Sequence, residues 1–315
     1  MAGKFIISLD FELRWGGAEK WELTKYKNYF LSTRGTIPIV LDLFEKRKIK
    51  STWATVGFLF AKSKKQLIEF SPLLKPTYDN KNLNYYEYFK NIGDNEKEDP
   101  LHFAGSLIEQ IIQTEGQELG THTFSHYYCN EKGQNIEQFE ADLIAVQNIA
   151  KENYHIELKS LVFPRNQYNV SYLNVARANG IEVVRSNPNV WFWKNTHGKV
   201  SPLFRAMDTL IPISDSVCFG EKDIKRTRII ELPASRFLRP YSSKEKAIQT
   251  LKINRIKNEM QYAAKNNLNY HLWWHPHNFG NFPMENVQQL KDILDHYQYL
   301  NEKYGFESVC MCDYR

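Results

Sequence analysis

The chain has 315 residues, of which 42% are hydrophobic and 24% charged, and its formal net charge is +5. These proportions are typical of folded globular proteins and exclude a disordered or collagen-like chain. The lysines form only short clusters, so they indicate solvated surface and not a nucleic-acid-binding patch. The positive balance suits an anionic substrate such as a nucleotide sugar or a lipid-linked sugar.

The first residues lead directly into a short apolar run, residues 5–9, which is too short for the core of a signal peptide. No apolar run approaches the roughly 20 residues that a membrane span requires. Four cysteines are too few for a disulfide framework in a chain of this length. We therefore expect a cytoplasmic protein without a transmembrane segment.

Short apolar runs alternate along the chain with longer segments whose apolar residues recur at helical spacing. The predicted strands cover residues 5–9, 51–56, 161–163, 181–184, 229–232, 270–274 and 306–311. The predicted helices cover residues 37–44, 136–150, 171–178, 244–264 and 285–304. This alternation predicts an α/β fold with a parallel sheet, either open or closed into a barrel.

Two stretches interrupt the alternation, at about residues 62–102 and 188–227. Both are irregular and rich in aromatic residues, so we interpret them as insertions on the rim of the barrel. No internal repeat or low-complexity linker divides the chain. We therefore expect residues 1–315 to form a single domain.

Two acidic residues, Asp10 and Glu12, stand at the end of the first predicted strand. Alternation along a strand places both side chains on the same face, at the carboxyl end. In parallel α/β folds active sites gather at that end. The alternative is an Asp that caps a loop and a Glu that forms a surface salt bridge.

Two histidines, His122 and His126, follow a short strand-like piece. If the chain becomes helical from Thr123 onward, both imidazoles share one face and can bind a single ion. Histidines at this spacing also cap helices or pack in cores, so a metal site needs a third ligand. An acid from the first strand is the candidate.

The strand predicted at residues 270–274 leads into His275-Pro-His277. His275 is a candidate general acid, because the pKa of an unperturbed histidine lies near neutral pH. His271, inside the strand, is expected to be a hydrogen-bonded core residue.

Another strand end carries Phe163-Pro-Arg165-Asn-Gln-Tyr168. Arg165 could orient a carboxylate by a bidentate contact, and backbone N–H groups nearby could stabilise an oxyanion. The alternative is a surface salt bridge, which is the more common role of an arginine after a strand.

Cys310 and Cys312 form a close pair on the last predicted strand, where alternation would place both on one face. Burial as small apolar side chains is the expected role, and metal or redox chemistry is the alternative.

Four of these motifs together resemble those of the polysaccharide deacetylase superfamily, carbohydrate esterase family four. They are Ser8-Leu-Asp10-Phe-Glu12, His122-Thr-Phe-Ser-His126, Phe163-Pro-Arg165-Asn-Gln-Tyr168 and Leu272-Trp-Trp-His275-Pro-His277. The resemblance runs from residue 5 to about residue 280. It is to a cytoplasmic branch whose first motif has two acids separated by one residue. It implies a distorted (β/α)7 barrel with rim insertions, and metal-assisted removal of an acyl group from a sugar nitrogen.

The resemblance also implies roles for single residues. Asp10 would be the general base, Arg165 would hold Asp10, and His275 would be the general acid. Glu12, His122 and His126 would bind one divalent ion, with zinc expected and cobalt, nickel or manganese as alternatives. The commonest form of the first motif has two adjacent aspartates, and Phe11 occupies the second of these positions. Whether Glu12 or Asp10 is the third ligand therefore stays open.

The expected substrate is a small or carrier-linked N-acylated amino sugar, bound by Tyr168, Trp191 and His277. Its acyl group would be acetyl or formyl, and its pathway the synthesis of a surface polysaccharide such as the O-antigen of lipopolysaccharide. One alternative is a non-sugar amidase of the allantoinase or cyclic imide hydrolase type, whose late motif His275-Pro-His277 resembles. Another is a carbohydrate-binding relative without catalytic activity.

Overall fold

The computed structural model describes residues 2–188, 190 and 217–315. Its strands are β1 (Lys4–Phe11), β2 (Ser51–Thr55), β3 (Gln117–Thr121), β4 (Ser160–Leu161), β5 (Val183–Ser186), β6 (Lys225–Arg226), β7 (Ile230–Pro233), β8 (Arg236–Phe237), β9 (Tyr270–Trp274) and β10 (Glu307–Val309). Its α-helices are α1 (Leu23–Lys46), α2 (Lys64–Glu69), α3 (Gly105–Gln113), α4 (Ile136–Tyr154), α5 (Val170–Ala178), α8 (Gln249–Lys265) and α9 (Pro283–Tyr304).

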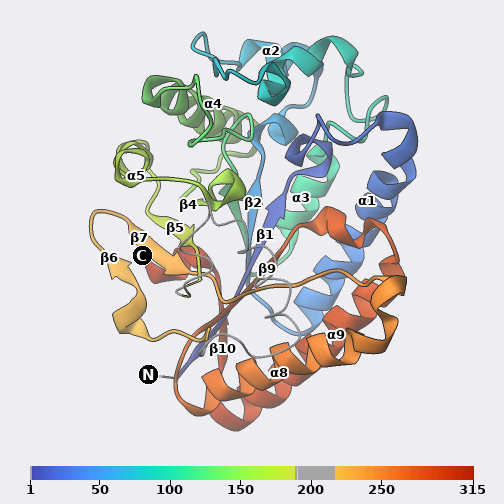
Figure 1. Ribbon diagram of the computed structural model, residues 1–315, viewed down its shortest axis with the longest axis vertical. Coiled ribbons are helices and arrows are strands. Elements are labelled where there is room, and N and C mark those ends of the chain that lie inside the picture. Colours follow the sequence, from blue (N-terminus) through green and yellow to red (C-terminus); the bar gives the residue numbers. More distant parts are fainter. Residues whose placement is uncertain (1, 189, 191–216) are drawn as a thin grey trace.

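The strands form one sheet in the order β6-β7-β5-β4-β3-β2-β1-β9-β8, and β10 pairs with β1. Every pair is parallel except β6 with β7. Long β1 crosses the middle of the molecule, with α8 and α9 side by side near its amino end (Figure 1). Because the main strands are parallel, their carboxyl ends meet at one end of the sheet.

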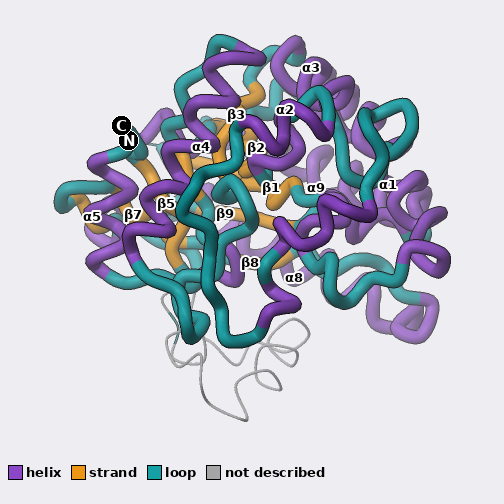
Figure 2. Tube along the Cα trace, turned by 90° about the horizontal axis from the view of Figure 1, so that it is seen from above, coloured by secondary structure: helices purple, strands orange, loops and turns teal. Residues whose placement is uncertain are grey.

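The sheet is curled, and one segment, residues 230–237, connects its two sides. β7 pairs with β5, and β8 pairs with β9. Between them, Ala234 N–H donates to the Ser186 carbonyl at 2.9 Å, and Ser235 N–H donates to the His271 carbonyl at 2.8 Å. The helices lie outside the strands (Figure 2). With β7 and β8 taken as one broken strand and the outlying β6 and β10 set aside, seven strands form the distorted barrel that was predicted.

Helix α4 illustrates how local sequence sets the element bounds. The Asn135 side chain accepts a hydrogen bond from the Gln138 N–H, and the Gln138 side chain accepts one from the Asn135 N–H, which forms a capping box. Phe139, Leu143 and Val146 recur at helical spacing and are fully buried. The helix ends at His155, whose φ of 56° is left-handed.

The predicted elements match the observed helices and strands best where the segment is strongly buried. Strand β9 has the predicted bounds, whereas the predicted strand 306–311 ends at Val309. Cys310 and Cys312 therefore lie in a short 3-10 turn and not on a strand. Helix α1 is longer than the predicted helix 37–44. Its first half is largely exposed and carries little apolar periodicity, so the sequence pattern did not reveal it.

The first predicted insertion, 62–102, contains α2 and several 3-10 turns, and α2 lies beyond the carboxyl end of β1 (Figure 1). Its last residue is fixed to the chain after β1. Arg14 Nη1 donates to His102 Nε2 at 2.9 Å, and His102 Nδ1 donates to Asp99 Oδ2 at 2.7 Å. The second predicted insertion, 188–227, lies largely outside the described residues. Within the described part of the chain, no helix is long and apolar enough to cross a membrane.

Candidate active site

A cavity of about 420 Å³ opens at the carboxyl end of the barrel. Asp10 and Glu12 both line it, as alternation along β1 predicted, and each is only 3% exposed. The complete lining is Asp10, Glu12, Gly16, Lys20, Trp21, His122, His126, Arg165, Asn166, Phe237, Trp273, His275, His277 and Asn278. Acids, imidazoles and aromatic rings from distant parts of the chain thus share one space.

His122 and His126 reach the cavity from a loop, so the helix that was considered from Thr123 onward does not form. Thr123 and His126 have left-handed φ values of 67° and 57°, which a continuous right-handed helix does not allow. The Thr123 hydroxyl accepts the Tyr127 N–H at 2.6 Å, so a side chain replaces a backbone partner. The histidines are brought together by this folded loop instead of by helical periodicity.

Asp142 of α4 holds the same loop from beneath. Its carboxylate accepts hydrogen bonds from the backbone N–H groups of Phe124, at 2.6 Å, and Ser125, at 3.0 Å. The Ser125 hydroxyl donates to it as well. Because Asp142 is 1% exposed, these contacts form away from water and fix the backbone that carries His126.

Replacement of Asp142 with asparagine is expected to remove a pH dependence of stability. Burial raises the pKa of Asp142 to about 7, and the hydrogen bonds from Ser125 and Phe124 offset only part of that. An unfolded aspartate titrates near about 3.9. Between these values the folded protein binds the extra proton, so stability contributed by Asp142 is lost as the pH rises through this window.

Urea unfolding of both proteins at about pH 5 and about pH 8 checks this expectation. The free energy of unfolding of the wild type, relative to D142N, should be larger at the lower pH. An equal difference at both pH values would contradict it.

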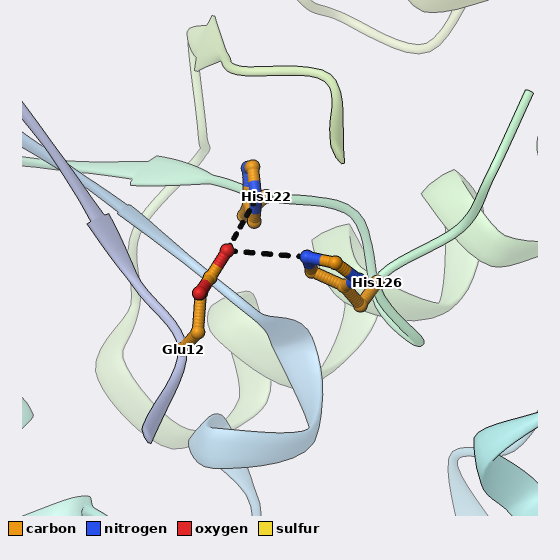
Figure 3. A group of neighbouring side chains, drawn as sticks. All are labelled: Glu12, His122 and His126. Carbon is orange, nitrogen blue, oxygen red and sulfur yellow. Dashed lines mark hydrogen bonds and ion pairs between the residues drawn. The ribbon is translucent and has the colours of Figure 1, made fainter. Parts of the chain in front are cut away.

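Glu12 lies between the two histidines (Figure 3). Its Oε1 is 3.0 Å from His122 Nε2 and 3.1 Å from His126 Nε2. One ligand atom from each of the three residues lies within 4.8 Å of the others, and all three side chains are buried. The acid grouped with the histidine pair is therefore Glu12.

The protonation state of His122 favours a cation between His122 and Glu12. His122 Nδ1 lies 2.7 Å from the Val162 carbonyl, which can only accept, so Nδ1 carries a proton. A neutral His122 then presents the lone pair of Nε2 to the Glu12 carboxylate, and two acceptors 3.0 Å apart repel each other. A cation between them, or a second proton on His122, removes the repulsion. The carbonyl contact is also the usual outer partner of a metal-binding histidine, so the residues present fit a divalent ion.

The pKa shifts of Glu12 and His126 also favour a bound cation. Burial by itself would raise the pKa of Glu12, but His275, His122 and His126 outweigh it and hold the pKa well below the usual range. Burial lowers the pKa of His126, and Glu12 offsets only part of that effect. Glu12 is thus an anion, and His126 favours the neutral form that binds metals.

Asp10 is held by Arg185, and the prediction that Arg165 holds it is wrong. Arg185 Nη1 and Nη2 donate to the two carboxylate oxygens of Asp10 at 2.7 and 2.8 Å. Burial would raise the pKa of Asp10, but Arg185, His122 and His275 together lower it. Asp10 therefore stays ionised, with one bidentate partner in a nearly dry setting.

A buried network fixes Arg185 in turn. Arg185 Nη1 also donates to the Ser8 hydroxyl at 3.1 Å, and Ser8 donates to His271 Nε2 at 2.8 Å. His271 Nδ1 donates to the Pro233 carbonyl at 3.0 Å. Burial lowers the pKa of His271 to about 3, so this neutral form persists. The prediction that His271 is a hydrogen-bonded core residue is confirmed.

Arg165 turns away because the chain reverses direction after β4. Arg165 and Asn166 have φ values of 57° and 51°. Arg165 Nη1 donates to Glu131 at 2.6 Å, and its guanidinium lies 4.1 Å from the centre of the Tyr128 ring. It still lines the cavity rim. The alternative given for Arg165, a salt bridge at the surface, describes its contacts.

Tyr168, predicted to bind substrate, is not among the residues lining the cavity. Its ring stacks on Phe163 with the centroids 4.8 Å apart, and its hydroxyl donates to Glu231 at 3.0 Å. The backbone reversal at Arg165 and Asn166 separates it from the acids of β1. Trp191, another predicted substrate contact, lies outside the described residues.

His275 faces the same cavity as the acids. Its Nε2 lies 3.6 Å from Asp10 Oδ2 and 3.8 Å from Glu12 Oε1, and 26% of its side chain is exposed. His277 lies deeper, with Nδ1 3.5 Å from Glu12 Oε2 and its ring against Trp21. Burial lowers the pKa of His277 to about 3. His277 thus offers a neutral ring and little surface to a substrate.

Sequence comparison supports the same family. A family model described as polysaccharide deacetylase matches residues 31–184, just under half of the chain. This segment of the chain is similar to the polysaccharide deacetylase family. No curated protein matches its sequence.

Solved structures match nearly the whole chain at low identity. A protein from Mycobacterium smegmatis described as a candidate polysaccharide deacetylase has a TM-score of 0.61 at 10% identity, covering 99% of this chain and 88% of its own. Puue allantoinase has a TM-score of 0.54 at 8% identity, covering 98% and 87%. A GH57-type branching enzyme from Pyrococcus horikoshii has a TM-score of 0.51 at 10% identity, covering 100% and 70%. These likenesses show the fold alone.

The sequence reasoning missed Arg185 and the aromatic side of the cavity. Arg185 was hidden at the end of an apolar strand, although a charged residue there requires a buried partner of opposite sign. Trp21, Phe237 and Trp273 line the cavity from three separate segments. Nothing in their local sequence distinguishes these rings from the many aromatic residues of the core.

Proposed function

We propose that this protein is a metal-dependent hydrolase that removes an N-acyl group from an amino sugar. The observation that carries the proposal is the convergence of His122 Nε2, His126 Nε2 and Glu12 Oε1 beside an ionised Asp10 and an accessible His275. This set combines a metal-ligand group with a separate base and acid. A binding protein would need neither of the last two.

Glu12, His122 and His126 would hold the ion. When bound, a divalent metal supplies a Lewis acid for the amide carbonyl and lowers the pKa of water. The ligand types suit zinc, and cobalt, nickel or manganese tolerate the same set.

The chain's own residues would move the protons. Asp10 takes the proton of the attacking water, since Arg185 holds its carboxylate ionised and fixed. His275 donates a proton to the leaving amine, because its Nε2 lies beside both acids and its ring is open to the cavity. The two groups thus line the same part of the cavity.

The substrate class rests on the shape and lining of the cavity. Trp21, Phe237 and Trp273 present rings on which the apolar face of a sugar can stack. Lys20 and Arg165 at the rim suit a phosphate on a nucleotide or lipid carrier. We propose an intermediate of surface polysaccharide assembly in the cytoplasm, with an acetyl or formyl group.

A non-sugar amidase is the second candidate, since the fold is also that of an allantoinase. Release of primary amine from N-acetyl and N-formyl amino sugars, free and nucleotide-linked, tests the proposal against ring opening of allantoin and cyclic imides. Amine release that a chelator stops and zinc or cobalt restores is the expected result. Ring opening alone would favour the second candidate, and no turnover of either after metal addition would favour a binding protein.

A further inference from the structure

A second cluster of metal-ligand residues lies at the other end of the barrel. Glu118, Cys310 and Cys312 each offer one ligand atom, and these atoms lie within 4.8 Å of one another. Glu118 is the second residue of β3, whereas His122 follows the carboxyl end of the same strand. The cluster is therefore separate from the candidate active site and shares no residue with it.

Backbone contacts hold the cysteines in place. Cys312 N–H donates to Glu118 Oε2 at 3.1 Å, and Met311 N–H donates to the Thr52 hydroxyl at 2.9 Å. The Thr52 hydroxyl donates to the same Glu118 oxygen at 2.5 Å. Three elements, β2, β3 and the turn after β10, thus fix the ligands before any ion binds.

One ligand atom lacks a partner. Glu118 Oε1 is buried and has no hydrogen-bond partner of good geometry, although Oε2 of the same carboxylate accepts two. The Ser160 hydroxyl and the Cys312 thiol also interact with this carboxylate. A buried carboxylate oxygen without a donor costs free energy unless a proton or a cation satisfies it. The cluster therefore contains suitable metal ligands, and a cation would satisfy the buried Glu118 Oε1.

We propose that Glu118, Cys310 and Cys312 bind a second, thiophilic divalent cation of the zinc type. Two thiolates and a carboxylate match the ligand preference of zinc, and a tetrahedral site with Zn–S distances of about 2.3 Å places its ligand atoms roughly 3.5–4 Å apart. Binding releases the two thiol protons to solvent, and water completes the coordination. The ion ties the C-terminal turn to β2 and β3, so its role is structural.

Cobalt is the probe that separates the two sites. Thiolate ligands give Co(II) a charge-transfer absorption in the near ultraviolet, and the candidate active site contains no thiolate. We expect this band when Co(II) is added to the reduced, chelator-treated full chain, and two zinc ions per chain by native mass spectrometry. The same band should persist in H126A, which removes a ligand of the first site only.

Substitutions at the second site identify its ligands. The band should be absent in C310S and in C312S, and E118Q should bind Co(II) at least about tenfold more weakly. Circular dichroism of each variant checks that it folds. A reduced wild type without the thiolate band, or a band that survives in the C310S/C312S double variant, would overturn the inference. The absorption does not depend on turnover, so it can fail or succeed independently of the proposed N-deacylation.

Discussion

Replacement of His126 with alanine is expected to remove one bound ion per chain and to lower N-deacylation by roughly a thousandfold or more. His126 supplies one of the three ligand atoms, and His122 and Glu12 supply the other two. A Lewis acid contributes several kcal/mol to such reactions, and about 1.4 kcal/mol corresponds to a tenfold change in rate. Metal content and kcat/KM, measured on the same sample, check the expectation.

His155 provides the matched control. It is exposed, does not line the cavity, and has a left-handed φ of 56°, which asparagine tolerates. H155N should therefore keep both the ion and the activity. An H126A protein that retains its full metal content and rate would refute the assignment of Glu12, His122 and His126.

Exchange of Arg185 for methionine is expected to shift the acidic limb of the pH–rate profile to higher pH. Arg185 is the strongest of the groups that lower the pKa of Asp10, while burial acts in the opposite direction. Without it the pKa rises, so the base is protonated over more of the acidic range and the rate there falls. General base catalysis contributes roughly 10²- to 10⁴-fold to the rate, which sets the largest decrease expected where the base is protonated.

The same exchange leaves a buried carboxylate without its partner, which typically costs about 3–5 kcal/mol of stability. R185K keeps the charge but loses the bidentate contact, so it should fold and show a smaller shift. R165Q is the decisive comparison, because Arg165 pairs with Glu131 and not with Asp10. A shift in R165Q equal to that in R185M would return Arg165 to the role that the sequence first indicated.

The alternation of strands and helices and the chemistry of single motifs could be read from the sequence. Asp10 and Glu12 share a face because strand geometry alone requires it. His122 and His126 were correctly paired, but for the wrong reason. Their loop depends on Asp142, a residue of another helix, and local periodicity contains no information about such a contact.

The arginine that holds Asp10 was beyond sequence reasoning for a similar cause. Arg165 follows a strand at the correct end of the barrel, but the left-handed φ of Arg165 and Asn166 directs the chain elsewhere. Arg185 belongs to the neighbouring strand β5, and its side chain crosses the barrel interior to β1. Which of two arginines meets an acid is decided by backbone turns and barrel curvature, and neither is visible in residue spacing.

Central β1 also bears on how the catalytic machinery forms during synthesis. Its acids are synthesised before their partners, because Asp10 meets Arg185 across 175 residues and His275 directly follows β9. The segment that matches the family, residues 31–184, contains neither acid and neither partner. Nascent chains that end before β9 would hold the histidine pair without a complete base and acid. The proposed amide hydrolysis would thus require that the ring of strands has closed.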